Sequence, residues 1–252
     1  GTQWWTSYQP VSYKLDSKLG TEAEFKNMIK QCNAVGVDII ADVVLNQTTG
    51  ADVADGKQTG VAGTEYNGST GDYPGFATEQ YPEGITASDF HSCSKNISNY
   101  ANQQEVQECR LSSMWDFDSE SEKVQDIQSD YLAALWNAGV RGFRMDAVKH
   151  IHTDSMKAIK EKFAKKIGVN ADSIYWIQEV IGNSSEAAGI QPSNYVQNGT
   201  VTEFGFKSEM NQTFKDKIAN LKGLNERLSK DLASEDANVF VTNWDTARSE
   251  ER

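Results

Sequence analysis

The sequence is poor in proline, cysteine and histidine, with four, three and three of them among 252 residues, and it contains no long apolar run. No stretch approaches the roughly 20 apolar residues that cross a bilayer, so we expect no membrane association. Basic residues are also scarce, 24 against 36 acidic ones, which gives a net charge of −12. This acidic balance argues against nucleic-acid binding and is compatible with a neutral substrate and with divalent cations.

The overall composition is that of an ordinary globular protein. Hydrophobic residues make up 38% and aromatic residues 10% of the chain, which excludes a disordered protein. A chain of this length can form one large barrel or two smaller domains. It begins with Gly1-Thr2-Gln3-Trp4-Trp5 and carries no signal peptide, so we expect it to be an internal part of a longer protein.

Two of the three cysteines are candidates for a disulfide. Cys93 and Cys109 lie in a loop-rich stretch and lack the Cys-x-x-Cys spacing of zinc sites. A bond between them is expected if the protein is secreted. Cys32 falls in an amphipathic segment, where we expect a buried free thiol.

Helical periodicity and buried, β-branched runs alternate along the chain. A helix is predicted to begin at Thr21, where Glu24 completes a capping box, and to end at Gly36. Further helices are predicted over about 120–138, 154–167 and 208–233. Strands are predicted over 37–45, 174–180, 200–206 and 238–245, and one more strand is predicted to begin at Gly142. Such alternation is typical of right-handed βαβ units in a parallel sheet. No glycine-rich phosphate loop follows any strand, which favours a (β/α)8 barrel over a doubly wound sheet.

One long segment interrupts this alternation. From residue 47 to 114, Gly, Thr, Asn, Ser and Asp dominate and no long period holds, and the segment is too long for a simple loop. We therefore predict a first barrel part over 1–46, an inserted domain over 47–114 and a second barrel part over 115–252.

Aromatic residues gather near the start of the chain. Trp4, Trp5 and Tyr8 lie close to Pro10, a pattern that does not indicate a helix. These side chains either form a structural corner or offer a stacking platform for a flat apolar ligand face such as a sugar ring.

Carboxylates stand at the ends of three successive predicted strands: Asp146, Glu179 and Asp245. Arg144 lies two positions before Asp146, so both side chains share one face and the guanidinium should lower the pKa of Asp146. An isolated Arg-x-Asp pair is more often a structural ion pair. The apolar residues before Glu179 should raise the pKa of Glu179, which suits a proton donor. Three acids at one barrel rim suggest glycoside hydrolysis.

The chain resembles the α-amylases of glycoside hydrolase family thirteen in the segment 142–150 (GFRMDAVKH), which in that family carries the nucleophile. It is similar to the family's third-strand motif at 42–46 (DVVLN), to its acid/base motif at 178–181 (QEVI) and to its seventh-strand motif at 240–245 (FVTNWD). Residues 3–10 (QWWTSYQP) resemble the same region of animal and actinobacterial members. The resemblance implies an α/β fold, a partial (β/α)8 barrel of about strands three to seven with domain B inserted after strand three.

The resemblance also implies roles for individual residues. Asp146 would be the nucleophile, Glu179 the general acid/base, and Asp245 would bind sugar hydroxyls and favour the distorted ring. Together they would perform retaining endo-hydrolysis of α-1,4-glucosidic bonds in starch-type or glycogen-type glucans. Substrate binding is implied for a larger group around the cleft: Trp4, Trp5, Tyr8, Gln9, Gln47, Arg144, Lys149, His150 and Trp244.

Two ions are implied by the same resemblance. Calcium would bridge domain B and the barrel through the side chains of Asn46 and Asp116 and through backbone carbonyls near Gln107 and His150, which are oxygen ligands that suit this cation. Arg144 and Asn243 match the chloride-binding pattern of animal-type members. The expected protein is a secreted monomer whose partner is an α-glucan, and we expect neither nucleic acid nor a membrane as a partner.

Two positions depart from the family pattern. The family has a histidine where this chain has Gln47 and another where it has Trp244, and both histidines hydrogen-bond the sugar at the cleavage point. Gln47 can replace a hydrogen bond, whereas the bulky indole of Trp244 only donates. The alternatives are therefore a catalytically weakened or silent glucan-binding relative, and a related transglycosylase.

Overall fold

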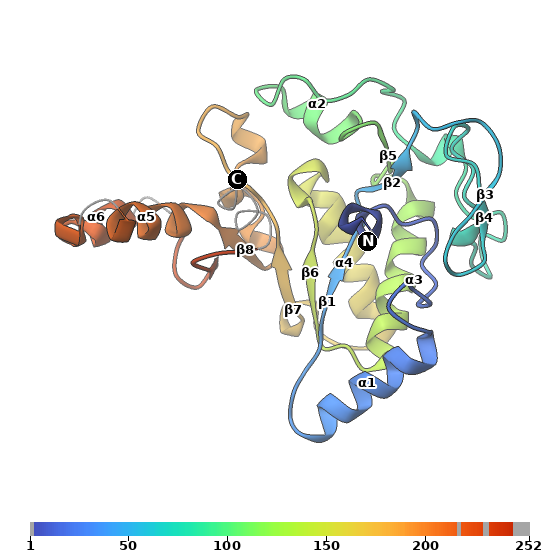
Figure 1. Ribbon diagram of the computed structural model, residues 1–252, viewed down its shortest axis with the longest axis horizontal. Coiled ribbons are helices and arrows are strands. Elements are labelled where there is room, and N and C mark those ends of the chain that lie inside the picture. Colours follow the sequence, from blue (N-terminus) through green and yellow to red (C-terminus); the bar gives the residue numbers. More distant parts are fainter. Residues whose placement is uncertain (1–2, 216–217, 229–231, 244–252) are drawn as a thin grey trace.

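The computed structural model describes residues 3–215, 218–228 and 232–243, and a parallel five-stranded sheet runs through it (Figure 1). Its strands lie side by side in chain order: β1 (Ile40–Val43), β6 (Gly142–Met145), β7 (Tyr175–Gln178), β8 (Thr200–Glu203) and β9 (Ala237–Val239). Each pairs in parallel with the next. Chain order without a reversal is the order of a (β/α)8 barrel, so the predicted partial barrel is confirmed.

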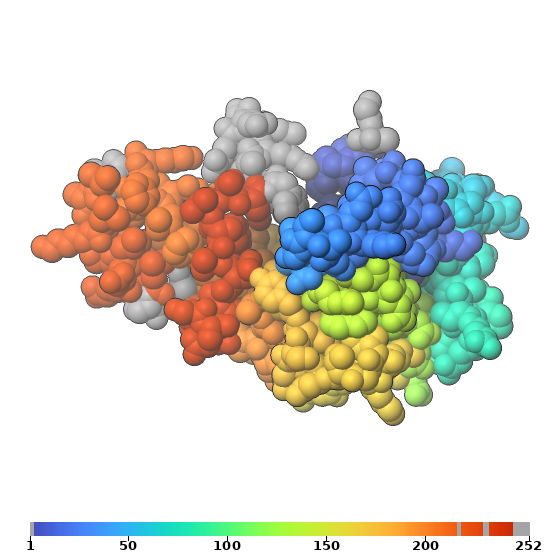
Figure 2. Space-filling model, turned by 90° about the horizontal axis from the view of Figure 1, so that it is seen from below, coloured from blue at the N-terminus to red at the C-terminus, as the bar shows by residue number. Residues whose placement is uncertain are grey.

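Helices cover this sheet and extend beyond it. They are α1 (Glu22–Ala34), α2 (Gln103–Glu108), α3 (Glu122–Ala138), α4 (Thr153–Ile167), α5 (Phe204–Lys215) and α6 (Leu224–Leu228). Figure 1 shows α3 and α4 along the sheet, whereas α5 and α6 reach away from it on the left. From below, α1, the end of α3 and the end of α4 form one continuous surface (Figure 2). Within the described residues, no helix combines the length and apolar character needed to cross a membrane.

Apolar side chains of the strands and of α3 and α4 form the main core. Phe143 of β6 packs edge-on against Phe163 of α4 and against Trp176 of β7, and all three are buried. Ion pairs reinforce the contact between the two helices at its edge, where Lys162 lies 2.6 Å from Asp126. Burial of this apolar surface, at about 25 cal/mol per Å2, is the main force that holds the helices on the sheet.

Local signals fix the ends of several helices. Thr21 accepts a hydrogen bond from the backbone of Glu24 and forms the predicted capping box. Gly139 ends α3 at φ 110°, a left-handed conformation that glycine adopts readily. A Cβ at this position would lie 2.7 Å from Ile29, so the glycine also allows α1 to approach. Asn33 of α1 donates to the Gly139 carbonyl at 3.2 Å.

Four expectations about local structure were wrong. Trp4–Tyr8 forms a short 3-10 helix, which needs no helical periodicity. Residues 204–206, expected in a strand, begin α5, and β9 stops at Val239. The free thiol of Cys32 is only partly buried.

The segment 47–114 contains short antiparallel strands and irregular turns. Its strands are β2 (Gln47–Gly50), which pairs with β5 (Met114–Asp116), and the hairpin β3 (Gln58–Thr59) with β4 (Glu65–Tyr66). A second core of aromatic and aliphatic side chains lies between this segment and the start of α3, formed by Tyr73, Phe76, Ile85, Phe90, Phe117, Val124 and Ile127. The predicted disulfide between Cys93 and Cys109 is confirmed, with their Cα atoms 4.8 Å apart.

The remaining short helices are of the 3-10 type and lie in the connections: Pro74–Phe76, Ala87–Asp89, Val148–His150, Ala171–Ser173, Ala188–Ile190, Pro192–Asn194, Val196–Asn198 and Ile218–Leu221.

Candidate active site

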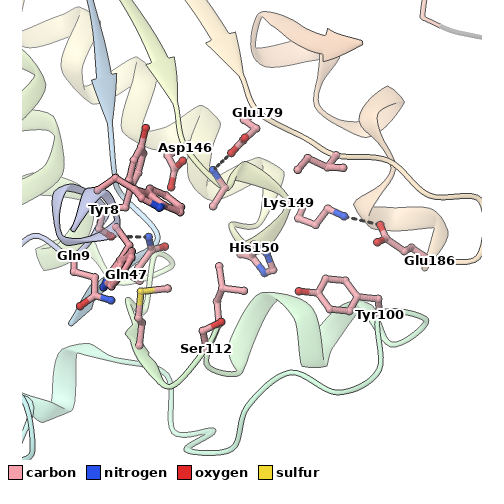
Figure 3. Close-up of a pocket in the computed structure, with 16 residues that line it drawn as sticks. Tyr8, Gln9, Gln47, Tyr100, Ser112, Asp146, Lys149, His150, Glu179 and Glu186 are labelled. Carbon is pink, nitrogen blue, oxygen red and sulfur yellow. Dashed lines mark hydrogen bonds and ion pairs between the residues drawn. The ribbon is translucent and has the colours of Figure 1, made fainter. Parts of the chain in front are cut away.

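A cavity of about 700 Å3 opens beyond the carboxyl ends of β1, β6 and β7 (Figure 3). Nine of the residues proposed from the sequence line it: Trp4, Trp5, Tyr8, Gln9, Gln47, Asp146, Lys149, His150 and Glu179. The carboxyl ends of parallel strands are where a (β/α)8 barrel gathers functional groups. The fold therefore brings together side chains that are up to 175 positions apart in the sequence, since Trp4 and Glu179 both line the cavity.

Arg144 lies beneath this cavity and contacts three carboxylates. Its Nη1 donates to Asp42 Oδ1 and to Asp146 Oδ1, each at 2.7 Å, and its Nη2 lies 2.7 Å from Glu179 Oε1. The register of β1 against β6 places Asp42 directly opposite Arg144. Tyr8 donates its hydroxyl to the other oxygen of Asp42 at 2.8 Å. One guanidinium thus orients the carboxyl groups of three strands.

The expected lowering of the Asp146 pKa is wrong. Burial raises the pKa of Asp146 to about 7, the charge of Glu179 adds to the rise, and Arg144 only partly opposes it. Three carboxylates around one guanidinium leave an excess of negative charge around the buried Asp146, so this group retains a proton up to near neutral pH. The pKa of Arg144 is raised by the same carboxylates despite burial, so this side chain stays charged.

The turn after β6 connects the two carboxyl groups. Ala147 adopts φ 50°, an uncommon left-handed conformation for a residue with a side chain. In this conformation its N–H donates to Glu179 Oε2 at 3.0 Å, and the N–H of Val148 donates to the Glu179 carbonyl at 3.0 Å. Glu179 therefore lies among polar donors, not in the apolar setting expected from residues 175–177. Backbone strain at this position is a common feature of functional sites.

Lys149 and His150 line the side of the cavity formed with Tyr100 and Leu111, which flank α2. Lys149 Nζ lies 2.7 Å from Glu186 Oε2 and 5.3 Å from the centre of the Tyr100 ring. His150 donates from Nδ1 to the carbonyl of Val106 at 3.0 Å. Burial lowers the pKa of His150 to about 4, so the ring is neutral at physiological pH.

Sequence reasoning missed several residues of this region. Tyr100, Leu111, Ser112, Met114, Ile181 and Glu186 also line the cavity. Asp42 was quoted in a motif without a role, although a charged residue within a strand expected to be buried is itself a signal. In the structure β1 is only partly buried and Asp42 is exposed. Glu186 lies in an irregular loop after β7, and no local pattern distinguishes it from other loop carboxylates.

The aromatic residues near the start of the chain form part of the cavity rim. Trp4 and Trp5 are 47% and 43% exposed and meet edge to face at 6.0 Å between ring centres. Such exposure favours a stacking platform over a structural corner. Gln47 is buried and donates from Nε2 to the Tyr8 carbonyl at 3.1 Å, so its oxygen is the amide atom left for a ligand.

The residues expected to hold calcium show features that fit this cation. Asp116 Oδ1 and the Asn46 amide nitrogen are buried without a hydrogen-bond partner. A 180° flip of the Asn46 amide exchanges its nitrogen and oxygen, so Asn46 can present its oxygen at the same place. Gln107 lies in the last turn of α2, where backbone carbonyls lack helical partners. Burial raises the pKa of Asp116 to about 7, which a nearby cation would reverse. A calcium ion would be held by these oxygens, with a carbonyl of His150 completing the expected set.

The remaining expected site residues receive less support. The contacts of Arg144 described above all go to carboxylates, which does not favour a chloride ion shared with Asn243. Asp245 and Trp244 lie outside the described residues.

Comparison with known proteins identifies the family of the chain. The α-amylase catalytic-domain model matches residues 6–252. The α-amylase of Streptomyces violaceus is 36% identical over 249 residues, which cover 98% of this chain and 40% of that protein. An α-amylase-related protein of Drosophila jambulina is 37% identical over 256 residues, covering 98% of this chain and 49% of that protein.

Solved structures agree with the sequence comparison. The crystal structure of α-amylase I from Eisenia fetida has a TM-score of 0.82 and 34% identity, and the match covers 97% of this chain and 49% of that one. A glutamate-to-glutamine variant of the same enzyme, in complex with maltohexaose, matches equally well. The chain thus spans about half or less of the length of these relatives. It belongs to the α-amylase family of glycoside hydrolases and corresponds to part of the family's catalytic domain.

Proposed function

We propose that this chain forms the catalytic cleft of a retaining, endo-acting α-1,4-glucan hydrolase. The observation that carries the proposal is the sharing of one guanidinium by Asp146 and Glu179 at the base of an open cavity. A bridge of this kind keeps two carboxyl groups close together. Retaining glycosidases need a separation of about 5–5.5 Å, whereas inverting enzymes leave wider room for a water molecule.

In the proposed reaction, Asp146 attacks the anomeric carbon while Glu179 donates its proton to the glycosidic oxygen. The bond to the leaving sugar breaks and a glycosyl ester with Asp146 forms. Glu179 then takes a proton from water, which cleaves the ester and restores both carboxyl groups. This sequence requires Asp146 to be ionised and Glu179 to carry the proton when attack begins, and the Arg144 guanidinium, 2.7 Å from Asp146, favours the ionised form of the nucleophile.

Features of the cavity support a glucan as the substrate. Trp4 and Trp5 present exposed rings on which sugars can stack, and the Trp4 ring meets Tyr8 edge to face at 6.1 Å between centres. Tyr8 and Gln9 lie close together on one side of the cavity (Figure 3). Lys149 and Glu186 offer charged groups for sugar hydroxyls on the opposite side. The maltohexaose bound to the Eisenia fetida variant supports an α-1,4-linked chain.

The proposal also covers the bound ions, the compartment and the oligomeric state of the protein. Calcium would stabilise the contact between an inserted domain over 47–114 and the barrel parts over 1–46 and 115–252, through Asn46 and Asp116. The disulfide between Cys93 and Cys109 supports secretion, because such bonds persist in oxidising compartments. We propose a monomer, and chloride stays a secondary expectation for Arg144 and Asn243.

The test is release of reducing ends from soluble starch by the protein in its natural length. We expect the wild type to release them and the Glu179→Gln variant to lose at least ~1000-fold in kcat, because the leaving oxygen is no longer protonated. Asn99→Gln, a loop substitution near Tyr100, serves as a control that keeps activity. Starch binding without hydrolysis by the wild type would overturn the proposal.

A second function is favoured by one observation, the replacement of a family histidine by Gln47. Its amide nitrogen is already bound to the Tyr8 carbonyl, so it offers less to a sugar than an imidazole would. The protein would then bind glucans with weak or no catalysis, or transfer glucosyl groups to another sugar. Analysis of products from maltohexaose distinguishes these outcomes, since transfer yields longer chains and a silent binder yields none.

A further inference from the structure

Among the described residues, one group of metal-ligating side chains lies away from the cavity. His91, Asp118 and Glu120 each offer a ligand atom, and these three atoms lie within 4.8 Å of one another. His91 comes from the segment 47–114, whereas the two carboxylates follow β5 and precede α3. None of its three ligand atoms is one proposed for calcium, although His91 contacts Asp116 and Gln107 lines the same hollow, and it differs from the proposed calcium site in supplying an imidazole nitrogen.

The ring of His91 is oriented as in metal centres. Its Nδ1 lies 2.7 Å from Asp116 Oδ2, which fixes the ring and directs Nε2 toward the two carboxylates. Nε2 lies 2.8 Å from Glu120 Oε2 and 3.8 Å from Asp118 Oδ1. A carboxylate on one imidazole nitrogen with a metal on the other is the recurring support of histidine ligands in zinc sites.

A second histidine approaches the group from the other side. His152, just before α4, lies 2.9 Å from Glu120 Oε1 and 4.0 Å from Glu108 Oε1. It thereby orients Glu120 toward His91. A hollow of about 620 Å3 lined by both histidines gives solvent and ions access to the ligand atoms. The chain contains only three histidines, so the presence of two of them here is notable.

We propose that His91 Nε2, Asp118 and Glu120 bind a divalent transition-metal ion of the zinc type. One nitrogen and two carboxylate oxygens supply three ligands, and water from the hollow supplies the fourth. Binding releases the Nε2 proton of His91 to solvent, and no redox change occurs. The ion ties the segment 47–114 to the start of α3, so it acts as a structural brace. This inference does not depend on the proposed glucan hydrolysis.

The test is calorimetric titration of ZnCl2 into the natural-length protein at pH 8, with calcium in excess to fill oxygen-ligand sites. We expect one zinc ion per chain and a rise in melting temperature. His91→Gln, Asp118→Asn and Glu120→Gln should each weaken zinc binding more than ~100-fold. Glu122→Gln is the matched control, because its side chain is 84% exposed and lies outside the group.

Two further measurements keep the test decisive. In the wild type, CoCl2 should give a visible absorption band that zinc abolishes, which requires no variant to fold. Asn46→Ala, which removes a proposed calcium ligand outside the group and leaves Asp116 in place to hold His91, should retain zinc binding. Absence of zinc heat and of the cobalt band overturns the proposal. So does zinc binding that survives all three ligand substitutions, or that is lost in Asn46→Ala, since the ion would then lie elsewhere.

Discussion

Arg144 Nη1 lies 2.7 Å from Asp146 Oδ1, yet the pKa of Asp146 is raised to about 7. Burial of Asp146 is the main cause of this rise, and the guanidinium offsets it only in part because Asp42 and Glu179 share the same arginine. Geometry and charge therefore act differently at this site: the arginine orients the acids, and the excess of acids keeps a proton among them. Several expected outcomes depend on this relationship.

Substitution Arg144→Lys should reduce kcat by ~100-fold or more. A lysine ammonium is a point charge that cannot bridge three carboxylates with the geometry of a planar guanidinium. The loss corresponds to about 2.7 kcal/mol of transition-state stabilisation. Steady-state kinetics on soluble starch measure the effect, with Arg141→Lys as the control, since Arg141 lies over Trp136 away from the cavity. A variant within threefold of wild type would contradict the orienting role.

The raised pKa of Asp146 predicts a pH dependence of stability. The folded protein binds this proton up to about pH 7, whereas the unfolded chain releases it near pH 4, so the native state holds more protons between these values. The contribution of Asp146 to the free energy of unfolding should therefore fall as pH rises through this window, by at most ~1.4 kcal/mol per pH unit. Urea unfolding of wild type and Asp146→Asn from pH 4 to 8, with calcium saturating, measures the difference. An unchanged difference across this range would contradict the prediction.

Calcium should stabilise the protein in a pH-dependent manner. Asp116 binds a cation only when ionised, and burial raises its pKa to about 7 without the ion. Calcium affinity should thus fall up to about tenfold per pH unit below pH 7 and level off above it. We expect EDTA to lower the melting temperature of the wild type at pH 8, and to have no further effect on Asp116→Asn. Zinc should be left out of these buffers. A melting temperature indifferent to EDTA would count against the site.

Local signals account for the parts of the fold that the sequence predicted. The capping box at Thr21, the stop at Gly139 and the pairing of Cys93 with Cys109 each depend on residues near in sequence or on a small set of cysteines. The alternation of apolar strands with helices in the sequence was sufficient to predict a parallel sheet.

Features that depend on distant contacts were not predictable in the same way. Asp42 and Arg144 are 102 positions apart and meet only through the register of β1 and β6. Without that contact, one of the acids that raise the pKa of Asp146 is missing from the charge balance. Glu186 and Tyr100 reach Lys149 from two separate loops, and loops carry little periodic information.

Substitution Gln47→His should raise kcat by ~10-fold or more if hydrogen bonding at the cleavage point limits turnover. Gln47 lines the cavity, but its Nε2 donates to the Tyr8 carbonyl, which leaves only the amide oxygen for a sugar hydroxyl. An imidazole at this position can donate to the sugar, and such a bond strengthens as charge develops in the transition state. Gln9→His, which adds the same ring at a neighbouring cavity position, should give no gain. If Gln47→His leaves kcat unchanged while the protein still binds starch, the missing hydrogen bond does not limit turnover.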